Sequence, residues 1–289
     1  MKLLAVACLT MVNCAQLLGL DNTKLEQTDA GTDASSVCDA VPESCAGTTG
    51  RSACGQVFGT GPDAGARFTV AAPTGAVCDG TSTEGPCALA VSGMPLQSLF
   101  DGNSTGEVIG QMDDCGRFVV NDIDSTATDV AIKLTDAGGL YQPTVTLKLA
   151  RTAEVGQDTG IAAYAVLVTT TTEWATQLGI DPANTSTGYL VKYTSSTGMA
   201  LANEAVAVDS GSPLMSPPGT IPWAAYFTGA AEFGTLDPAA TVTAESGTAF
   251  AGMPAGPFSL EGFRQGRRCK RENLRTVGNT LIHVLEDDC

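Results

Sequence analysis

The sequence predicts an all-β fold of short antiparallel strands, and three observations carry that prediction. Glycine is abundant, at 33 of 289 residues, whereas aromatic residues make up only 6% of the chain. From Arg67 onward, short β-branched runs are closed by Gly, Pro, Asp or Asn, as in strands joined by tight turns. Val145, Leu147 and Leu149 alternate with polar residues, as on a half-buried strand. The spacing of the runs favours an antiparallel sandwich or barrel over βαβ units.

Two sets of strand-like runs follow one another, with a turn and a candidate domain boundary at 181–184. The first set is RFTVAAP, TGAVCDG, CALAVSG, GEVIGQMDD, GRFVVNDI, DVAIKLTD, PTVTLKLA and AAYAVLVTTT. A short helix is expected next, at 172–178, because Trp174 and Leu178 share a face and Gly179 can end it. The second set is GYLVKYTSSTG, ALANEAVAVDSG, WAAYFTG, ATVTAESGTAFAG and GPFSLEGF. In the tail, NTLIHVLE fits either a strand or a short helix.

The N-terminus has the composition of an export signal. Lys2 precedes an apolar stretch, Leu3 to Val12, that is shorter than the roughly 20 residues needed to span a bilayer. No other segment is long and apolar enough, so we expect no membrane-spanning segment. Two processing routes are open: cleavage near residues 14–16, which releases a soluble protein, or lipidation of Cys14 as the mature N-terminus. We favour lipidation, because Met11-Val12-Asn13-Cys14 resembles a bacterial lipobox, although Asn13 replaces the usual Gly or Ala.

Eight cysteines follow the leader, an even number that indicates an oxidising compartment and up to four disulfides. They are Cys38, Cys45, Cys54, Cys78, Cys87, Cys115, Cys269 and Cys289. We expect the first three to pair with one another or with the next three, among about 105 connectivities that sequence cannot distinguish. Because Cys269 and Cys289 lie past the last recognisable strand set, we expect the second domain to have no disulfide of its own.

Charge limits the partners of the chain. The formal net charge is −16, yet six of the fifteen basic residues fall in one short run. They are Arg264, Arg267, Arg268, Lys270, Arg271 and Arg275. The acidic remainder repels nucleic acid and anionic headgroups, so we expect no nucleic-acid partner and membrane contact only through the lipid. The basic run either binds a polyanion or pairs with the acidic body, and we favour the second.

Several turn and core residues carry a resemblance to a known family. In GEVIGQMDDCGRFVVNDI, a D-x-x-G-x-F turn is matched by Asp113, Gly116 and Phe118, with Cys115 inserted. The second set resembles the opening G-x-P-L-x-x-A-x-V-x-V strand pair and the closing G-x-F-x-L, with Ala200 in place of the usual Pro. The matching residues are Gly198, Leu201, Ala205, Val206, Val208, Gly256, Phe258 and Leu260. These segments resemble the carboxypeptidase regulatory-like, or transthyretin-like, β-sandwich.

The resemblance covers roughly half the chain and implies two antiparallel Greek-key β-sandwich domains with a structural or binding role. Together with the leader, it makes the chain similar to a predicted lipoprotein of myxobacteria-like Gram-negative bacteria. The expected segments are a signal peptide with a lipobox, a flexible, disordered linker, domain 1, domain 2 and a basic tail. Their bounds are 1–14, 15–60, 61–183, 184–263 and 264–289.

The sequence shows no arrangement typical of a catalytic site. The single histidine, His283, has no G-x-S-x-G elbow before it, and the cysteine spacings suit disulfide loops better than zinc. No phosphate-binding glycine loop or dinucleotide fingerprint is present. We therefore expect a protein that is not an enzyme and has no cofactor. The alternative from another class is a secreted hydrolase whose paired carboxylates meet in an interdomain cleft.

One acidic loop is a candidate for calcium. Asp122, Asp124 and Asp129 place several oxygen ligands on one short segment, as a hard cation requires. The loop lacks the glycine and terminal glutamate of an EF-hand, and an acidic turn without an ion is the reading we favour. The leading hypothesis is thus an exported, lipid-anchored envelope protein, outer-membrane or secreted, that binds an envelope or cell-surface protein or a polysaccharide. A calcium- or carbohydrate-binding surface protein is a further alternative.

Overall fold

The computed structural model describes the body of the chain and two cysteines ahead of it. The described residues are 38, 45, 51–70, 73–79, 81–149, 157–185, 188–195, 197–209, 213–214, 221–253, 255–264, 267–269, 272–277 and 282–289. The predicted leader with Cys14, and most of the predicted linker, lie outside them. Within these ranges, no helix has both the length and the apolar character needed to cross a bilayer.

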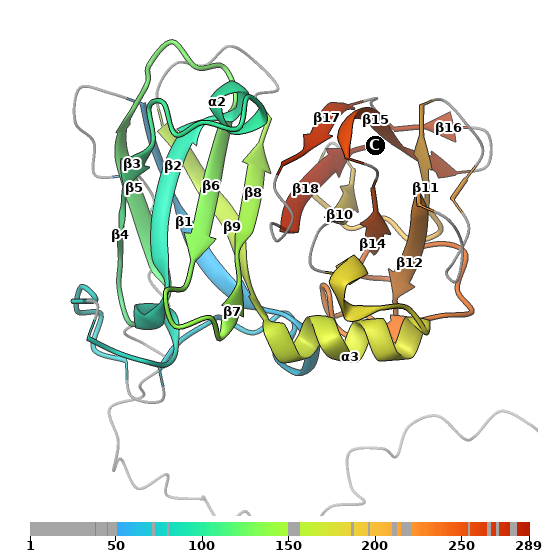
Figure 1. Ribbon diagram of the computed structural model, residues 1–289, viewed down its shortest axis with the longest axis horizontal. Helices are drawn as coiled ribbons and strands as arrows, with labels where there is room; N and C mark the ends of the chain where they lie inside the picture. Colours follow the sequence, from blue (N-terminus) through green and yellow to red (C-terminus); the bar gives the residue numbers. More distant parts are fainter. Residues whose placement is uncertain are drawn as a thin grey trace, which may run out of the picture.

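In the N-terminal lobe, a five-stranded sheet packs against one end of a larger, nine-stranded sheet (Figure 1). The five-stranded order is β4 (Gln111–Met112), β5 (Arg117–Ile123), β1 (Arg51–Gly59), β9 (Gln157–Leu167) and β7 (Tyr141–Gln142). β1 is antiparallel to β5 and parallel to β9. An aliphatic cluster fills the space between the layers, with Val57, Val120 and Ile132 fully buried.

A nine-stranded sheet runs through both lobes. Its order is β13 (Leu236–Asp237), β12 (Trp223–Phe227), β14 (Thr248–Gly252), β10 (Gly188–Thr194), β18 (Ile282–Asp288), β8 (Thr144–Lys148), β6 (Val130–Thr135), β2 (Ala90–Pro95) and β3 (Val108–Ile109). The C-terminal strand β18 lies between β8 and β10 and is parallel to both (Figure 1). Leu147, Val191 and Leu285 from these strands belong to one hydrophobic cluster. The two lobes therefore share sheet and core.

A third sheet and the helices complete the C-terminal lobe and the junction. The sheet contains β11 (Ala205–Val208), β15 (Gly256–Arg264), β16 (Arg267–Arg268) and β17 (Glu272–Thr276). The helices within the described ranges beyond residue 50 are α2 (Leu96–Phe100) and α3 (Val168–Leu178), with 3-10 turns at Gly61–Asp63, Pro86–Ala88 and Pro182–Thr185. α3 begins four residues earlier than expected, because it continues directly from β9. Gly179 ends it in the left-handed conformation, as predicted (φ 65°).

Two expected strands are absent from the described residues. In the runs RFTVAAP and TGAVCDG, the described residues 67–70, 73 and 74–79 belong to no strand, and their β-pairing consists of isolated bridges, Phe58 with Arg67 and Val77 with Asp113. Gly85 and Pro86 likewise open a 3-10 turn before β2 begins at Ala90. The β-branched residues in these runs therefore line loops, because closely spaced Gly and Pro interrupt strand pairing.

The observed sheets differ from the expected division into linker, two separate sandwiches and tail. β1 lies in the segment expected to be linker, and it is buried on both faces, so its residues show no alternation. The segment expected to be a tail contributes β16, β17 and β18. NTLIHVLE contains the strand β18, in which Ile282, Val284 and Leu285 are all buried. The fold is β-rich as predicted, with the last strand inside the molecule.

Candidate functional site

The eight cysteines from Cys38 to Cys289 all form disulfides. The pairs are Cys38–Cys115, Cys45–Cys54, Cys78–Cys87 and Cys269–Cys289. Residues 184–263, the expected second domain, contain no cysteine, but the expected tail that carries Cys269 and Cys289 belongs to the same lobe. Cys269 is buried and its N–H donates to Gly262 O (3.0 Å), while the Cys289 N–H donates to Thr194 O (2.8 Å). The tail folds back into the lobe, so its disulfide stabilises that lobe.

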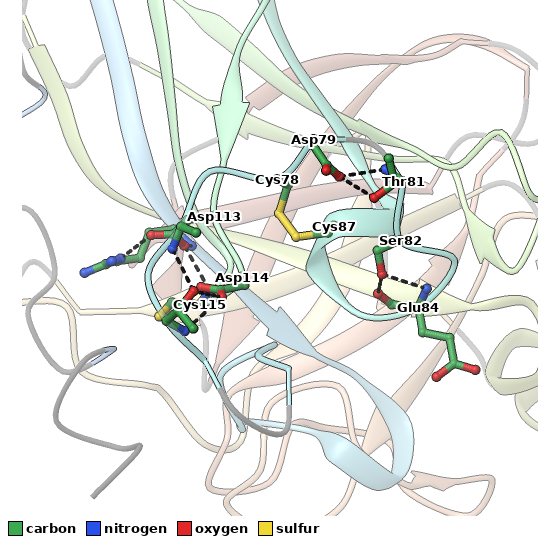
Figure 2. The surroundings of a disulfide bond; sticks show 12 residues. Cys78, Asp79, Thr81, Ser82, Glu84, Cys87, Asp113, Asp114 and Cys115 are labelled. Atoms are coloured by element: carbon green, nitrogen blue, oxygen red, sulfur yellow. Dashed lines mark hydrogen bonds and ion pairs between the residues drawn. A yellow bond between two sulfur atoms is a disulfide. The ribbon is translucent and has the colours of Figure 1, made fainter. Parts of the chain in front are cut away.

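The D-x-x-G-x-F turn between β4 and β5 is held by its own aspartate (Figure 2). Asp113 Oδ1 accepts from the backbone N–H groups of Cys115 (3.1 Å) and Arg117 (2.9 Å). Its Oδ2 accepts from Arg117 Nε at 2.7 Å. Gly116 has φ 71°, which a residue with a side chain adopts only under strain. These contacts stabilise the turn, and they use both oxygens of the Asp113 carboxylate.

The neighbouring Asp114 holds a loop of the N-terminal lobe. Its carboxylate accepts from Thr74 N–H (2.8 Å), Thr74 Oγ1 (2.7 Å) and Gly75 N–H (2.7 Å). Partial burial acts to raise the pKa of Asp114, but these hydrogen bonds outweigh it and hold the pKa below the ordinary 3.8. Beside it, the Cys78–Cys87 disulfide closes a loop. In this loop Asp79 Oδ1 accepts hydrogen bonds from the backbone N–H and the hydroxyl of Thr81 (Figure 2). The carboxylates of Asp114 and Asp79 therefore stabilise the backbone of nearby loops.

Two clusters in the described part of the chain bring three carboxylate or sulfur side chains together, and neither suits a metal. One joins Asp113 and Asp114 to Cys115, and the other joins Glu204 to Cys269 and Cys289. The sulfur atoms in both clusters belong to disulfides, so no thiolate is present to bind an ion.

The three calcium candidates belong to neither cluster. Asp124 Oδ1 accepts from Thr126 N–H (2.9 Å) and Oγ1 (2.7 Å), and these bonds lower its pKa. Asp122 lies in β5 with φ 61°, and the Asp129 carbonyl accepts from Leu96 N–H (3.0 Å). The structure therefore does not bring the three carboxylates together as a group of ligands.

The single histidine lies deep in the nine-stranded sheet. His283 is fully buried in β18, and its ring stacks on Tyr189 with 4.7 Å between ring centroids. Tyr189 is itself buried and donates to Arg275 O at 2.9 Å, and burial raises the pKa of its phenol. This is the environment of a core residue.

A polar crevice opens where the lobes meet, between α2 and β17. We call it the interlobe crevice. Its volume is about 630 Å³. Its lining comprises Pro95, Leu96, Gln97, Phe100, Thr126, Ala127, Thr128, Asp129, Leu149, Glu272 and Asn273. A second hollow of about 560 Å³ continues it and shares Gln97, Phe100 and Asn273.

The walls of the crevice are fixed by hydrogen bonds. Arg275 Nη1 on β17 donates to Phe100 O on α2 (3.0 Å) and so links the lobes. Buried Arg51 donates to the carbonyls of Ala127 and Thr128 and forms an ion pair with Asp158 (2.8 Å). The sequence suggests Asp129 as a calcium ligand, but it gives no sign of the crevice. Its residues come from segments far apart in the chain, and no local pattern marks their meeting.

Comparisons with known proteins give weak likenesses. No family model matches the chain, and no curated protein does. The Bacillus anthracis TIE protein aligns at 9% identity and TM-score 0.21 over 82% of this chain and 33% of its own, so this chain spans about a third of it. A mutant of shaft pilin SpaA from Lactobacillus rhamnosus GG aligns at 12% identity and TM-score 0.22, over 83% of this chain and 98% of the pilin chain. A streptococcal ancillary pilin aligns at 10% identity and TM-score 0.22, over 82% of this chain and 68% of the pilin chain. No family assignment follows from scores this low.

Proposed function

We propose that the chain is an exported, non-enzymatic protein of the cell envelope that acts as a structural and binding module. The observation that carries this is the pairing of all eight cysteines behind the leader. Disulfides persist in oxidising compartments and are rare in the cytosol. The carboxylates of Asp113, Asp114 and Asp124 are occupied in turns, which supports a structural rather than a catalytic use.

The finer assignment is a transthyretin-like lipoprotein tethered through Cys14. The D-x-x-G-x-F turn supports it, because Asp113 caps the turn and Phe118 is buried beside it. The lipobox-like residues and the polar run after them support the tether. A tethered β-rich body presents its loops and crevice to an envelope protein or polysaccharide.

The anchor is tested by expressing the full-length chain in a Gram-negative host and fractionating the cells. We expect the wild-type protein in the membrane fraction, with an intact mass increased by a diacylglyceryl group on Cys14. A Cys14→Ala variant should lose that mass and leave the membrane fraction, whereas Cys8→Ala, the matched leader control, should behave like wild type. A membrane-associated protein without an adduct would refute the anchor.

A second candidate function is hydrolysis by paired carboxylates. It is favoured by one observation, that Asp129 and Glu272 line the same interlobe crevice although they come from different lobes. A hydrolase of this class uses one carboxyl as an acid and the other as a base or nucleophile. Release of reducing ends from a neutral polysaccharide, lost in Glu272→Gln, would establish this function, and its absence with wild-type protein would exclude it.

A further inference from the structure

We propose that the interlobe crevice binds a neutral, hydroxyl-rich ligand, a segment of a polysaccharide chain. This inference rests on the binding role proposed above and assigns a ligand class to one site. The crevice lies at the junction of two lobes, where ligand sites commonly form, and its volume of about 630 Å³ suits a small-molecule segment.

The charges around the crevice disfavour an anionic ligand. Asp129 and Glu272 line it, and Asp209 lines the adjoining hollow. The chain carries a formal net charge of −16, which adds a long-range repulsion. Among the described residues that line the adjoining hollow, Arg275 is the cationic one, and its Nη1 donates to the carbonyl of Phe100. A phosphate- or carboxylate-rich chain would therefore approach the carboxylates of Asp129, Glu272 and Asp209.

The lining groups match hydroxyls. Amide and hydroxyl side chains both donate and accept hydrogen bonds, as a sugar hydroxyl does. Gln97 and Asn273 place amides on opposite walls, Thr128 adds a hydroxyl, and Thr126 Oγ1, which donates to Asp124 Oδ1, adds an acceptor. Asn273 Oδ1 accepts from Ser259 Oγ (3.1 Å), which orients the amide and leaves its two N–H groups as donors. Gln97 Nε2 is likewise oriented by Asp101 Oδ1 (2.8 Å), so its carbonyl oxygen remains an acceptor.

One aromatic ring lies where the two hollows join. Phe100 lines both hollows and is only partly buried, packed against the core on one side. A flat apolar ring of this kind can pack on the C–H face of a pyranose while the polar groups bind its edge. Pro257 adds a second apolar surface in the adjoining hollow. The arrangement is amphipathic, as the surface of a sugar ring is.

An extended peptide is the competing occupant, because β17 pairs only with β15 among the described strands. Two observations favour the saccharide. β17 carries the charged residues Glu272 and Arg275, and charged residues on an edge strand discourage strand addition. The Arg275–Phe100 hydrogen bond also crosses beside this edge to α2. The side chains of both walls, rather than the backbone of one strand, are therefore the recognition surface.

The test uses the full oxidised chain and defined soluble probes. The neutral probes are hexasaccharides of β-1,4-glucose, α-1,4-glucose, β-1,4-mannose and β-1,4-N-acetylglucosamine. An oligogalacturonate is the anionic probe, and a pentapeptide of strand-forming residues is the peptide probe. Calorimetric titration should show binding of at least one neutral hexasaccharide and of neither control.

Three variants locate the binding. Gln97→Ala and Asn273→Ala should each weaken it by about 2- to 12-fold, the effect of losing one hydrogen bond. Gln111→Ala removes an exposed glutamine on β4, outside the crevice, and should leave affinity unchanged. Circular dichroism confirms that each variant is folded.

Absence of binding by all four neutral probes would overturn the inference. So would binding that Gln97→Ala and Asn273→Ala leave unchanged, or a preference for the anionic or peptide probe. None of these results bears on the disulfides or on the mass at Cys14. Failure of this inference is therefore distinguishable from failure of the proposed function.

Discussion

The two lobes are stabilised by different means. The N-terminal lobe has three disulfides, and its buried cluster is mostly aliphatic, with Phe118 and Tyr141 as its aromatic members. The C-terminal lobe has one disulfide and a cluster rich in large rings. In that cluster Trp174 packs on Phe227 and Phe250, with ring centroids 5.2 and 5.6 Å apart.

The difference shows how a glycine-rich chain with few aromatics reaches adequate stability. A buried aromatic ring contributes a large apolar area, whereas the small residues of β1, such as Ala53, contribute little. Cross-links compensate by restricting the unfolded chain. Of the disulfides, Cys45–Cys54 joins β1 directly, and Cys38–Cys115 ties the chain before β1 to the turn before β5. The aromatic residues are instead concentrated where fewer cross-links exist.

The largest expected effect comes from the disulfide with the longest sequence separation. Cys38 and Cys115 are 77 positions apart, so replacing both with Ala should cost about 4.5 kcal/mol of unfolding free energy. The Cys78→Ala/Cys87→Ala variant spans only 9 positions and should cost about 2.6 kcal/mol. Denaturant unfolding of both variants measures the ranking. Equal losses would show that the length of the closed loop does not govern stabilisation here.

The corresponding test in the C-terminal lobe removes a ring. Phe250 is fully buried against Trp174 and Trp223, so Phe250→Ala should cost about 3–5 kcal/mol. The loss should appear as faster hydrogen exchange in β10, β12 and β14, with β1 and β5 less affected. Phe250→Leu, which keeps much of the volume, should cost less. Equal exchange changes in both lobes would mean that the aromatic cluster supports the whole molecule.

The C-terminal disulfide should matter mainly for β18. Cys269 and Cys289 are 20 positions apart, so Cys269→Ala/Cys289→Ala should cost about 3 kcal/mol. Because Cys289 lies beside β10, where its N–H donates to Thr194 O, the variant should also expose 282–289 to limited proteolysis, whereas Cys78→Ala/Cys87→Ala should not. A tail that remains resistant would show that pairing with β8 and β10 alone holds the strand.

The smallest expected effect is acid sensitivity of the loop held by Asp114. Its folded pKa lies below the ordinary 3.8, so its stabilising contribution is present above that pH and is lost as pH falls through the folded pKa. The protection of the Thr74 and Gly75 amides against hydrogen exchange, relative to their intrinsic rates, should fall below about pH 3.8. In Asp114→Asn this protection should be weak at all pH values. A pH-independent wild-type loop would contradict the assigned hydrogen bonds.

Sequence patterns predicted the β-rich fold and several strands, but not the sheet order. β5, β6 and β8 follow from alternation in the sequence and from the Gly, Asp and Pro residues that bound them. β8 is nevertheless not half-buried as expected, because Thr144 and Thr146 are buried as well. β1 and β18 are buried on both faces, so alternation is absent, and neither position in the chain suggested an interior strand.

Contacts between residues far apart in the chain could not be predicted from the sequence either. Cysteine count predicted cross-links, but only the fold selects Cys38–Cys115 among the alternatives. The crevice joins Gln97, Asp129 and Glu272 across more than one sheet, and each of these residues is unremarkable in its own segment.

Disulfide mapping of the protein isolated from its native cells tests the central claim most directly. Free thiols are first alkylated, and peptides are then separated without reductant and identified by mass. The account predicts no alkylated cysteine behind the leader and four linked pairs, Cys38–Cys115, Cys45–Cys54, Cys78–Cys87 and Cys269–Cys289. Alkylation of these cysteines without reductant would contradict export to an oxidising compartment, and different pairs would contradict the fold.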